Sequence, residues 1–199
     1  MAVSQRQKQK TETKKFLIET AMEQFAKKGL SATRTADIAS AAKVSHGTIF
    51  LHFPTRERLL EEVIEEFGSR TSRRMHELIN GDCNLEEVLA AHLKGIGECE
   101  GFYTALISET AVLPEGARNA LIMIQSAISH HILQVAERGM DAGTIKTMPF
   151  DLFFNTWIGL IHYYLSNRAL FSPEDSVISR HGQRLTDHYM NLISAKGGI

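Results

Sequence analysis

The chain has 199 residues, 43% of them hydrophobic, which suits one or two small domains with a buried core. Residues 1–60 carry 11 of the 22 Lys and Arg but only 5 of the 23 Asp and Glu, so a basic first third precedes an acidic body. This asymmetry is typical of a protein that touches a polyanion with one part only. The two cysteines exclude a disulfide framework and favour a reducing cytoplasm.

No segment is typical of a membrane-spanning or secreted protein. Residues 1–15 are polar and do not form a signal peptide. The longest apolar run, 150–165, is interrupted by polar residues and is shorter than the roughly 20 residues that a membrane span needs. The sequence also lacks a Gly-rich phosphate loop, a Gly-x-Ser-x-Gly elbow and a His-Glu-x-x-His motif, so we expect no enzyme, no cofactor, no catalytic residue and no metal site.

The chain begins with a polar, basic stretch over residues 1–10 that has no apolar periodicity. We interpret it as a flexible arm, which either solubilises the chain or contacts the DNA backbone. A first helix is predicted over 11–28, where apolar residues at i and i+4 form one broad stripe. Gly29 is predicted to end this helix in the left-handed conformation.

Residues 34–53 are predicted to form two short helices joined by a tight turn. Small or apolar residues recur where two such helices would cross, namely at Ile38, Ala39, Ala42, Val44 and Ile49. Thr33 or Thr35 is expected to cap the first helix, Ser45 to cap the second, and Pro54 to end it. A short second helix that begins with small polar residues is typical of a helix-turn-helix, which enters the DNA major groove.

Residues 11–71 resemble the DNA-binding domain of the TetR family of transcriptional regulators. The resemblance rests on Phe25-Ala26-Lys27-Lys28-Gly29-Leu30, Thr35-Ala36-Asp37-Ile38-Ala39, Val44-Ser45-His46-Gly47-Thr48-Ile49-Phe50 and His52-Phe53-Pro54-Thr55-Arg56-Glu57-Arg58-Leu59-Leu60. It implies a three-helix helix-turn-helix domain over 11–71 and an effector-binding and dimerisation domain over 72–199. It also implies a homodimeric repressor that binds an inverted repeat in double-stranded DNA.

The resemblance and the residue types together give the candidate DNA contacts. These are Arg34, Thr35, Lys43, Ser45, His46, Gly47, Thr48, Phe50, Leu51, His52 and Arg56. His46 and Thr48 carry the groups that can read base edges. In the family, the positions of Thr35, His52 and Arg56 contact phosphate.

Three of these candidates depart from the family pattern. Lys43 stands where the turn commonly has Gly, and a non-Gly residue in the left-handed conformation costs roughly 1 kcal/mol. Phe50 stands where Tyr is common, so a hydroxyl that could bond phosphate is missing, and Leu51 also differs from the pattern.

The rest of the chain shows helical periodicity and no strand alternation, so we expect an all-α fold with about nine helices. A long helix over 55–79 is predicted to connect two domains and to end at Asn80-Gly81-Asp82. Five further helices are predicted, over 85–98, 102–112, 115–142, 150–167 and 173–195.

The helix over 150–167 is apolar around most of its circumference, which predicts burial on all sides. The resemblance implies that the last two helices pair with their copies in a dimer, and the alternative is a buried core helix in a monomer. The predicted dimer-interface residues are Phe154, Ile158, Ile161, Leu165, Ile178, Leu185, Tyr189 and Leu192.

An apolar pocket for an unknown small effector is predicted in the second domain. Its candidate lining residues are His92, Phe102, Tyr103, Ile107, Met123, Trp157, His162 and Tyr164. Each of these residues taken alone is more typical of an ordinary core or surface, because any core contains aromatic and Met residues at helical spacing. The alternative function is a DNA-binding regulator controlled by a protein partner or a metal.

Overall fold

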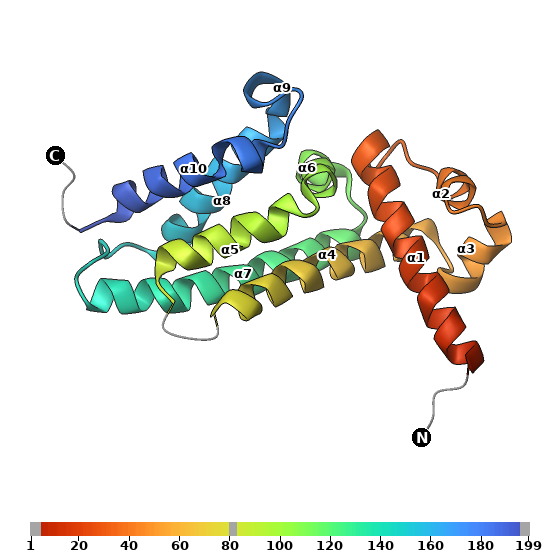
Figure 1. Cartoon of the computed structure of the whole chain (residues 1–199), viewed down its shortest axis with the longest axis horizontal. Coiled ribbons are helices and arrows are strands. Elements are labelled where there is room, and N and C mark those ends of the chain that lie inside the picture. The colour runs from red at the N-terminus through yellow and green to blue at the C-terminus, as the bar shows by residue number, and fades with distance from the viewer. Residues whose placement is uncertain (1–4, 80–82, 196–199) are drawn as a thin grey trace. The chain divides into compact units, whose positions relative to one another are not determined.

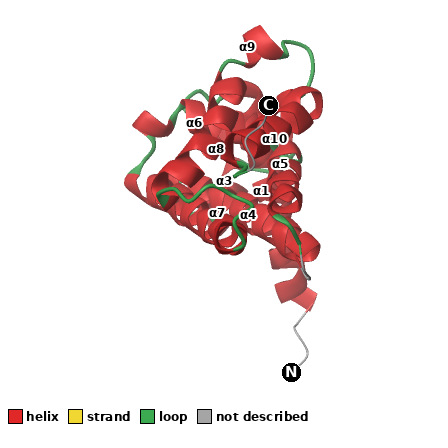
Figure 2. Cartoon of the chain, turned by 90° about the vertical axis from the view of Figure 1, so that its left-hand side faces the viewer, coloured by secondary structure: helices red, strands yellow, loops and turns green. Residues whose placement is uncertain are grey.

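The computed structural model describes residues 5–79 and 83–195, and in these ranges every element is helical (Figures 1 and 2). The all-α class predicted from the sequence is confirmed. The α-helices are α1 Gln5–Lys28, α2 Thr35–Ala41, α3 His46–His52, α4 Arg56–Ile79, α5 Leu85–Gly97, α6 Glu100–Ser108, α7 Glu115–Asp141, α8 Phe150–Ser166, α9 Arg168–Phe171 and α10 Val177–Ile193, and a 3-10 helix, η1, spans Thr110–Val112. No described helix is long and apolar enough to cross a membrane.

The chain divides by its internal contacts into two compact units. The first unit comprises residues 1–68 and 101–122 where described, and the second unit comprises 69–100 and 123–199 where described. Both α4 and α7 contribute residues to each unit. The predicted functional boundary near residue 71 stays a prediction, but by contact α6 and η1 belong with the N-terminal helices.

The core of the first unit joins α1 and α4 to α6. Phe102 of α6 lies between two rings, with centroids 6.4 Å from Phe25 of α1 and 5.8 Å from Phe67 of α4. Tyr103 stacks on Phe67 at 5.1 Å. All four side chains are buried, so the N-terminal helices share a core with a segment that lies far along the chain from them.

The core of the second unit centres on Trp157 of α8 and Tyr189 of α10, whose ring centroids lie 5.2 Å apart. Both are fully buried. The Tyr189 hydroxyl donates to the carbonyl oxygen of Phe153 at 2.6 Å, and burial raises the pKa of this hydroxyl. The Trp157 Nε1–H donates to His92 Nδ1 of α5 at 3.1 Å, so α5, α8 and α10 share one core.

The helix boundaries differ from the predicted ones in three places. Residues 5–10, predicted as a flexible arm, form the first turns of α1, because Gln, Lys and Arg favour helix even without an apolar stripe. The single helix predicted over 102–112 is α6 followed by η1, and α9 separates α8 from α10. The predicted break at Asn80-Gly81-Asp82 lies outside the described residues.

Candidate nucleic-acid interface and ligand cavity

Helices α2 and α3 form the predicted helix-turn-helix. The turn between them passes through Lys43 at φ 55°, the left-handed conformation that its position requires. The Ser45 hydroxyl accepts the Thr48 N–H at 3.1 Å, so the predicted cap of the second helix is confirmed. Ile38 and Ile49 are buried and hold α2 and α3 together, which fixes where the polar start of α3 lies.

The predicted threonine cap of α2 is wrong. Thr33 is buried and its hydroxyl donates to the carbonyl oxygen of Gly29 at 2.7 Å. The start of α2 is held instead by Asp37, whose carboxylate accepts the Arg34 N–H at 2.9 Å and pairs with Lys28 at 2.7 Å. The hydrogen bond from Lys28 and that from Arg34 lower the pKa of this carboxyl.

The predicted base-reading side chains lie at the start of α3 and are already hydrogen-bonded within the protein. His46 Nε2 lies 2.8 Å from the Thr35 hydroxyl, and the Thr48 hydroxyl lies 2.8 Å from that of Ser45. These bonds orient the polar groups before any contact with DNA. A base contact must therefore use the remaining donors and acceptors or exchange these bonds.

The outer face of α3 also exposes two large apolar side chains. Phe50 and Leu51 are exposed, and the Phe50 ring meets the His46 ring edge to face at 4.9 Å. Large exposed apolar side chains on a recognition helix can contact the methyl group of thymine. Phe50 and Leu51, which depart from the family pattern, therefore remain suited to apolar contacts in the major groove.

Arg56 lies at the start of α4 and is engaged with the turn between α1 and α2. Its guanidinium donates to the carbonyl oxygens of Leu30 and Thr33, the latter at 3.1 Å, and lies over the Phe25 ring. The guanidinium has five N–H groups, so the predicted phosphate contact would use those that remain. Arg56 thus has a structural role that the sequence did not predict.

Glu109, which follows the last residue of α6, also binds this turn. Its carboxylate accepts the Leu30 N–H at 2.7 Å, the Ser31 N–H at 2.8 Å and the Ser31 hydroxyl. Burial raises the pKa of this carboxyl, but the hydrogen bonds from Ser31 and Leu30 lower it by more. No local pattern reveals this contact, since 78 positions separate Glu109 from Ser31.

His52 ends α3, and it is half-buried. Its Nδ1 is buried and has no hydrogen-bond partner among the described residues. Burial, and then the charges of Lys10 and Lys14, lower the pKa of the imidazole. The predicted phosphate-contacting histidine therefore lies beside two lysines of α1, a proximity that the sequence did not predict.

The predicted dimer-interface residues lie mainly inside the subunit. Ile161, Leu165 and Tyr189 are fully buried in the chain's own core, and of the eight only Leu192 is widely exposed, at 48%. Helical periodicity identifies an apolar face without telling whether the subunit's own helices or a partner cover it, so the interface stays a prediction. Eight residues of α8 are exposed, namely Phe150, Asp151, Leu152, Asn155, Thr156, Gly159, Tyr163 and Ser166. Four of these, Leu152, Thr156, Gly159 and Tyr163, follow one another at helical spacing and form an exposed stripe.

The eight predicted effector residues do not form one lining in either unit. Phe102, Tyr103 and Ile107 belong to the first unit, and His92, Trp157, His162 and Tyr164 belong to the second, while Met123 is 71% exposed. His92 and Trp157 bond each other within the core. Burial lowers the pKa of His92 to about 3 and that of His162 to about 4, so both imidazoles are neutral.

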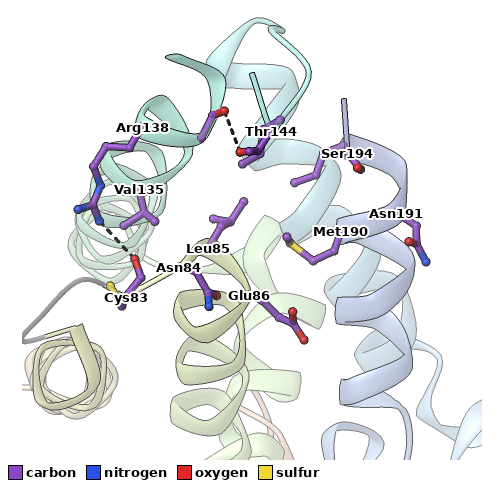
Figure 3. Close-up of a pocket in the computed structure, with 13 residues that line it drawn as sticks. Cys83, Asn84, Leu85, Glu86, Val135, Arg138, Thr144, Met190, Asn191 and Ser194 are labelled. Carbon is purple, nitrogen blue, oxygen red and sulfur yellow. Dashed lines mark hydrogen bonds between the residues drawn. The ribbon is translucent and has the colours of Figure 1, made fainter. Parts of the chain in front are cut away.

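A cavity of about 520 Å³ lies within the second unit, between the start of α5 and the ends of α7 and α10 (Figure 3). Leu85, Val135 and Met190 give it apolar walls, and Arg138 stands at its rim, where it donates to the Cys83 carbonyl oxygen at 3.4 Å. Its size and mixed lining suit a small, mostly apolar molecule. Across residues 5–79 and 83–195 we find no cluster of three or more His, Cys, Asp or Glu that could hold a metal ion.

Sequence comparison matches residues 17–63 to the family model described as bacterial regulatory proteins, tetR family. The chain is 34% identical over 76 residues to an HTH-type transcriptional repressor of Mycobacterium tuberculosis, covering 38% of this chain and 40% of the repressor. It is 39% identical over 77 residues to the HTH-type transcriptional regulator LuxR of Vibrio harveyi, covering 39% of this chain and 38% of LuxR. The alignments thus span about two fifths of these relatives' length.

Two solved structures extend the likeness to the whole chain. A TetR-family regulator from Agrobacterium tumefaciens has a TM-score of 0.77 at 17% identity, covering 93% of this chain and 99% of that one. The regulator FadR from Bacillus subtilis, solved in complex with stearoyl-CoA, has a TM-score of 0.70 at 22% identity, covering 92% of this chain and 98% of FadR. At these identities the likeness shows a shared fold.

Proposed function

Because this chain belongs to the TetR family of bacterial regulatory proteins, we propose that it is a sequence-specific DNA-binding repressor that acts as a homodimer. The observation that carries the proposal is the start of α3. There the Ser45 cap, the exposed His46 and the half-buried Thr48 present polar groups of fixed orientation on a short helix. This is what direct reading of base edges in the major groove requires.

Selection from a pool of random duplexes tests the DNA-binding proposal, because it finds the operator and the affinity for it in one experiment. We expect enrichment of an inverted repeat whose half-sites are about 34–36 Å apart, because a two-fold dimer reads successive major grooves. His46→Ala should lower the preference for the enriched duplex over random DNA by about 1–3 kcal/mol. Absence of any enriched sequence would contradict the proposal.

The exposed stripe of α8 supports the dimer. Leu152 and Tyr163 are 56% and 58% exposed, which is unusual for large side chains on one face unless a partner covers them. Between them, a Cβ atom added at Gly159 would meet nothing within 4 Å, so two copies of α8 can approach closely there. We therefore propose this stripe as the contact between subunits, joined by Leu192 of α10.

Gly159→Arg should convert the dimer to a monomer at micromolar concentration, measured by sedimentation, with unchanged helical content. The added side chain has room in the subunit but would meet the partner's helix. Ala90→Arg is the matched control, because Ala90 is exposed on α5 of the same unit and outside the stripe. A Gly159→Arg variant that stays dimeric would exclude this stripe as the interface.

We further propose that a small, mostly apolar ligand releases the repressor from DNA. The cavity between α5, α7 and α10 supports this part, since its volume and apolar walls suit such a molecule. A screen by thermal shift, followed by release of bound duplex, would find the ligand. Met190→Trp, which fills the cavity, should abolish the response if the ligand binds there.

A further inference from the structure

A hydrogen bond joins the first residues of α2 and α3. Thr35 begins α2 and His46 begins α3, and the Thr35 hydroxyl lies 2.8 Å from Nε2 of the imidazole. The Phe50 ring, about one turn further along α3, meets the same imidazole edge to face at 4.9 Å. His46 is exposed, so it is these two neighbours that fix the orientation of its ring before any DNA binds.

The hydrogen bond leaves Nδ1 of His46 as the ring nitrogen available to another molecule. Nε2 is engaged with Thr35, and no described residue hydrogen-bonds Nδ1. Neutral histidine in water carries its proton mainly on Nε2, and the hydroxyl oxygen of Thr35 can accept a hydrogen bond from that N–H. Because the hydrogen bond at one ring nitrogen determines the protonation of the other, Nδ1 keeps its lone pair and is an acceptor.

We propose that Thr35 positions His46 so that Nδ1 accepts a hydrogen bond from the N6 amine of an adenine, and that Phe50 contacts the methyl group of the thymine paired with it. The inference rests on the proposed DNA-binding function and deepens it, since it specifies a base pair that each subunit reads. Thr35 then acts through His46 and not on a phosphate, which is the contact that the resemblance implies for its position.

The choice of an A·T pair follows from the groups that the major groove exposes. Only adenine N6 and cytosine N4 present donors there, so an acceptor such as Nδ1 of His46 excludes guanine and thymine as its direct partner. The exposed Phe50 ring distinguishes the remaining two, because an A·T pair carries a methyl group in the major groove and a G·C pair carries none. An acceptor beside an apolar ring therefore matches an amine and a methyl group on one base pair.

The position of the ring proton tests the acceptor role in the wild-type protein. Nuclear magnetic resonance of the ring nitrogens at pH 8, with the signals of His46 assigned by His46→Ala, should show a proton on Nε2 and none on Nδ1. The same tautomer should persist in the complex with a duplex. A proton on Nδ1 would overturn the inference, because that nitrogen would then be a donor and could not accept from adenine.

Thr35→Val tests the positioning role, because it removes the hydroxyl and keeps the shape of the side chain. In selections from random duplexes, the wild-type protein should enrich an A·T pair at one position of each half-site. Thr35→Val should lower this one preference about fivefold, the loss expected for a single hydrogen bond. Thr35→Ser should keep it. Thr11→Val is the matched control, since it removes an exposed threonine hydroxyl from α1 of the same unit.

A double-mutant cycle separates the positioning role from a phosphate contact. If Thr35 acts through His46, Thr35→Val should have no further effect on base preference or affinity in a protein that already carries His46→Ala. A phosphate contact would give a different result, because Thr35→Val would then weaken binding to every duplex equally in both backgrounds. That result would overturn the inference.

Uracil in place of the paired thymine tests Phe50, since the two bases differ only by the methyl group. The wild-type protein should bind the uracil duplex about fourfold more weakly than the thymine duplex, and Phe50→Ala should bind the two equally. Equal weakening in both proteins would overturn the A·T assignment. Failure of the wild-type protein to bind any duplex would instead overturn the proposed function, so the two failures are distinguishable.

Discussion

The turn between α1 and α2 and the core between α5, α8 and α10 are held by opposite chemistry. At the turn, the Glu109 carboxylate and the Arg56 guanidinium bond backbone groups of residues 30–33. In the core, neutral rings bond each other, with Trp157 donating to His92. The turn therefore depends on charges being present, whereas the core depends on charges being absent.

This contrast follows from solvent access. The carboxylate of Glu109 is partly solvated and receives N–H groups, so its ionised form is the stable one. His92 is 1% exposed, and protonation would both bury a charge and remove the acceptor that Trp157 uses. Adding a proton therefore destabilises both regions. At the turn it removes the charge of Glu109, and in the core it places a charge on His92.

A fall in pH should have the largest effect on stability, and it should act on the core between α5, α8 and α10. The pKa of His92 is about 3 in the folded chain and about 6.5 in the unfolded one, so the unfolded chain binds more protons between these values. The free energy of unfolding should fall as the pH drops below 6.5, by about 2 kcal/mol from His92 at pH 5. Trp157, the sole tryptophan, reports urea unfolding of this core.

His92→Gln is the control for the acid experiment, because Gln offers Trp157 an acceptor but does not titrate. The variant should lose less stability between pH 7 and pH 5 than the wild-type protein. His162, whose pKa is about 4, accounts for a remaining dependence of the same sign. Equal losses in the variant and the wild type would contradict a neutral His92.

Loss of the Glu109 charge should have the next largest effect, and on the turn. Glu109→Gln should destabilise the turn by about 1 kcal/mol, since hydrogen bonds to a charged acceptor are roughly twice as strong as neutral ones and this site is partly exposed. Exchange of the Leu30 and Ser31 amide hydrogens should quicken about fivefold. Glu12→Gln, an exposed change on α1, should leave both amides unchanged.

The smallest expected effect is an increase in stability at the turn between α2 and α3. Lys43 has φ 55°, so Lys43→Gly should stabilise the helix-turn-helix by roughly 0.5–1 kcal/mol. Slower exchange of the Val44 amide, which bonds the Ala39 carbonyl oxygen, would measure it. Lys43→Asn should give part of the gain, because Asn tolerates this conformation. Faster exchange in both variants would show that Lys43 stabilises the turn by a contact of its own.

The sequence predicted the helix-turn-helix well because its determinants are local. Ser45 caps a helix that starts at the next residue, and the strain at Lys43 follows from one turn. The buried and exposed faces of α8 could not be predicted in this way, since α8 has apolar residues on most sides and only packing tells that Trp157 faces inward while Tyr163 faces outward. Glu109 was missed because no spacing rule connects a carboxylate to a turn 78 positions earlier.

Residues 101–122 belong to the first unit although residues of the second unit separate them from it in the sequence, so no single cut in the chain isolates the first unit. A fragment cut near residue 71 would contain the whole helix-turn-helix but would lack Phe102, which packs on Phe25 and Phe67, and Glu109, which holds the turn. Transplanting residues 1–71 onto the body of another regulator would also require that body to supply an aromatic side chain and a carboxylate in register. The helix-turn-helix and the residues that support it are therefore discontinuous in the sequence, so recombination at a single junction cannot transfer them together.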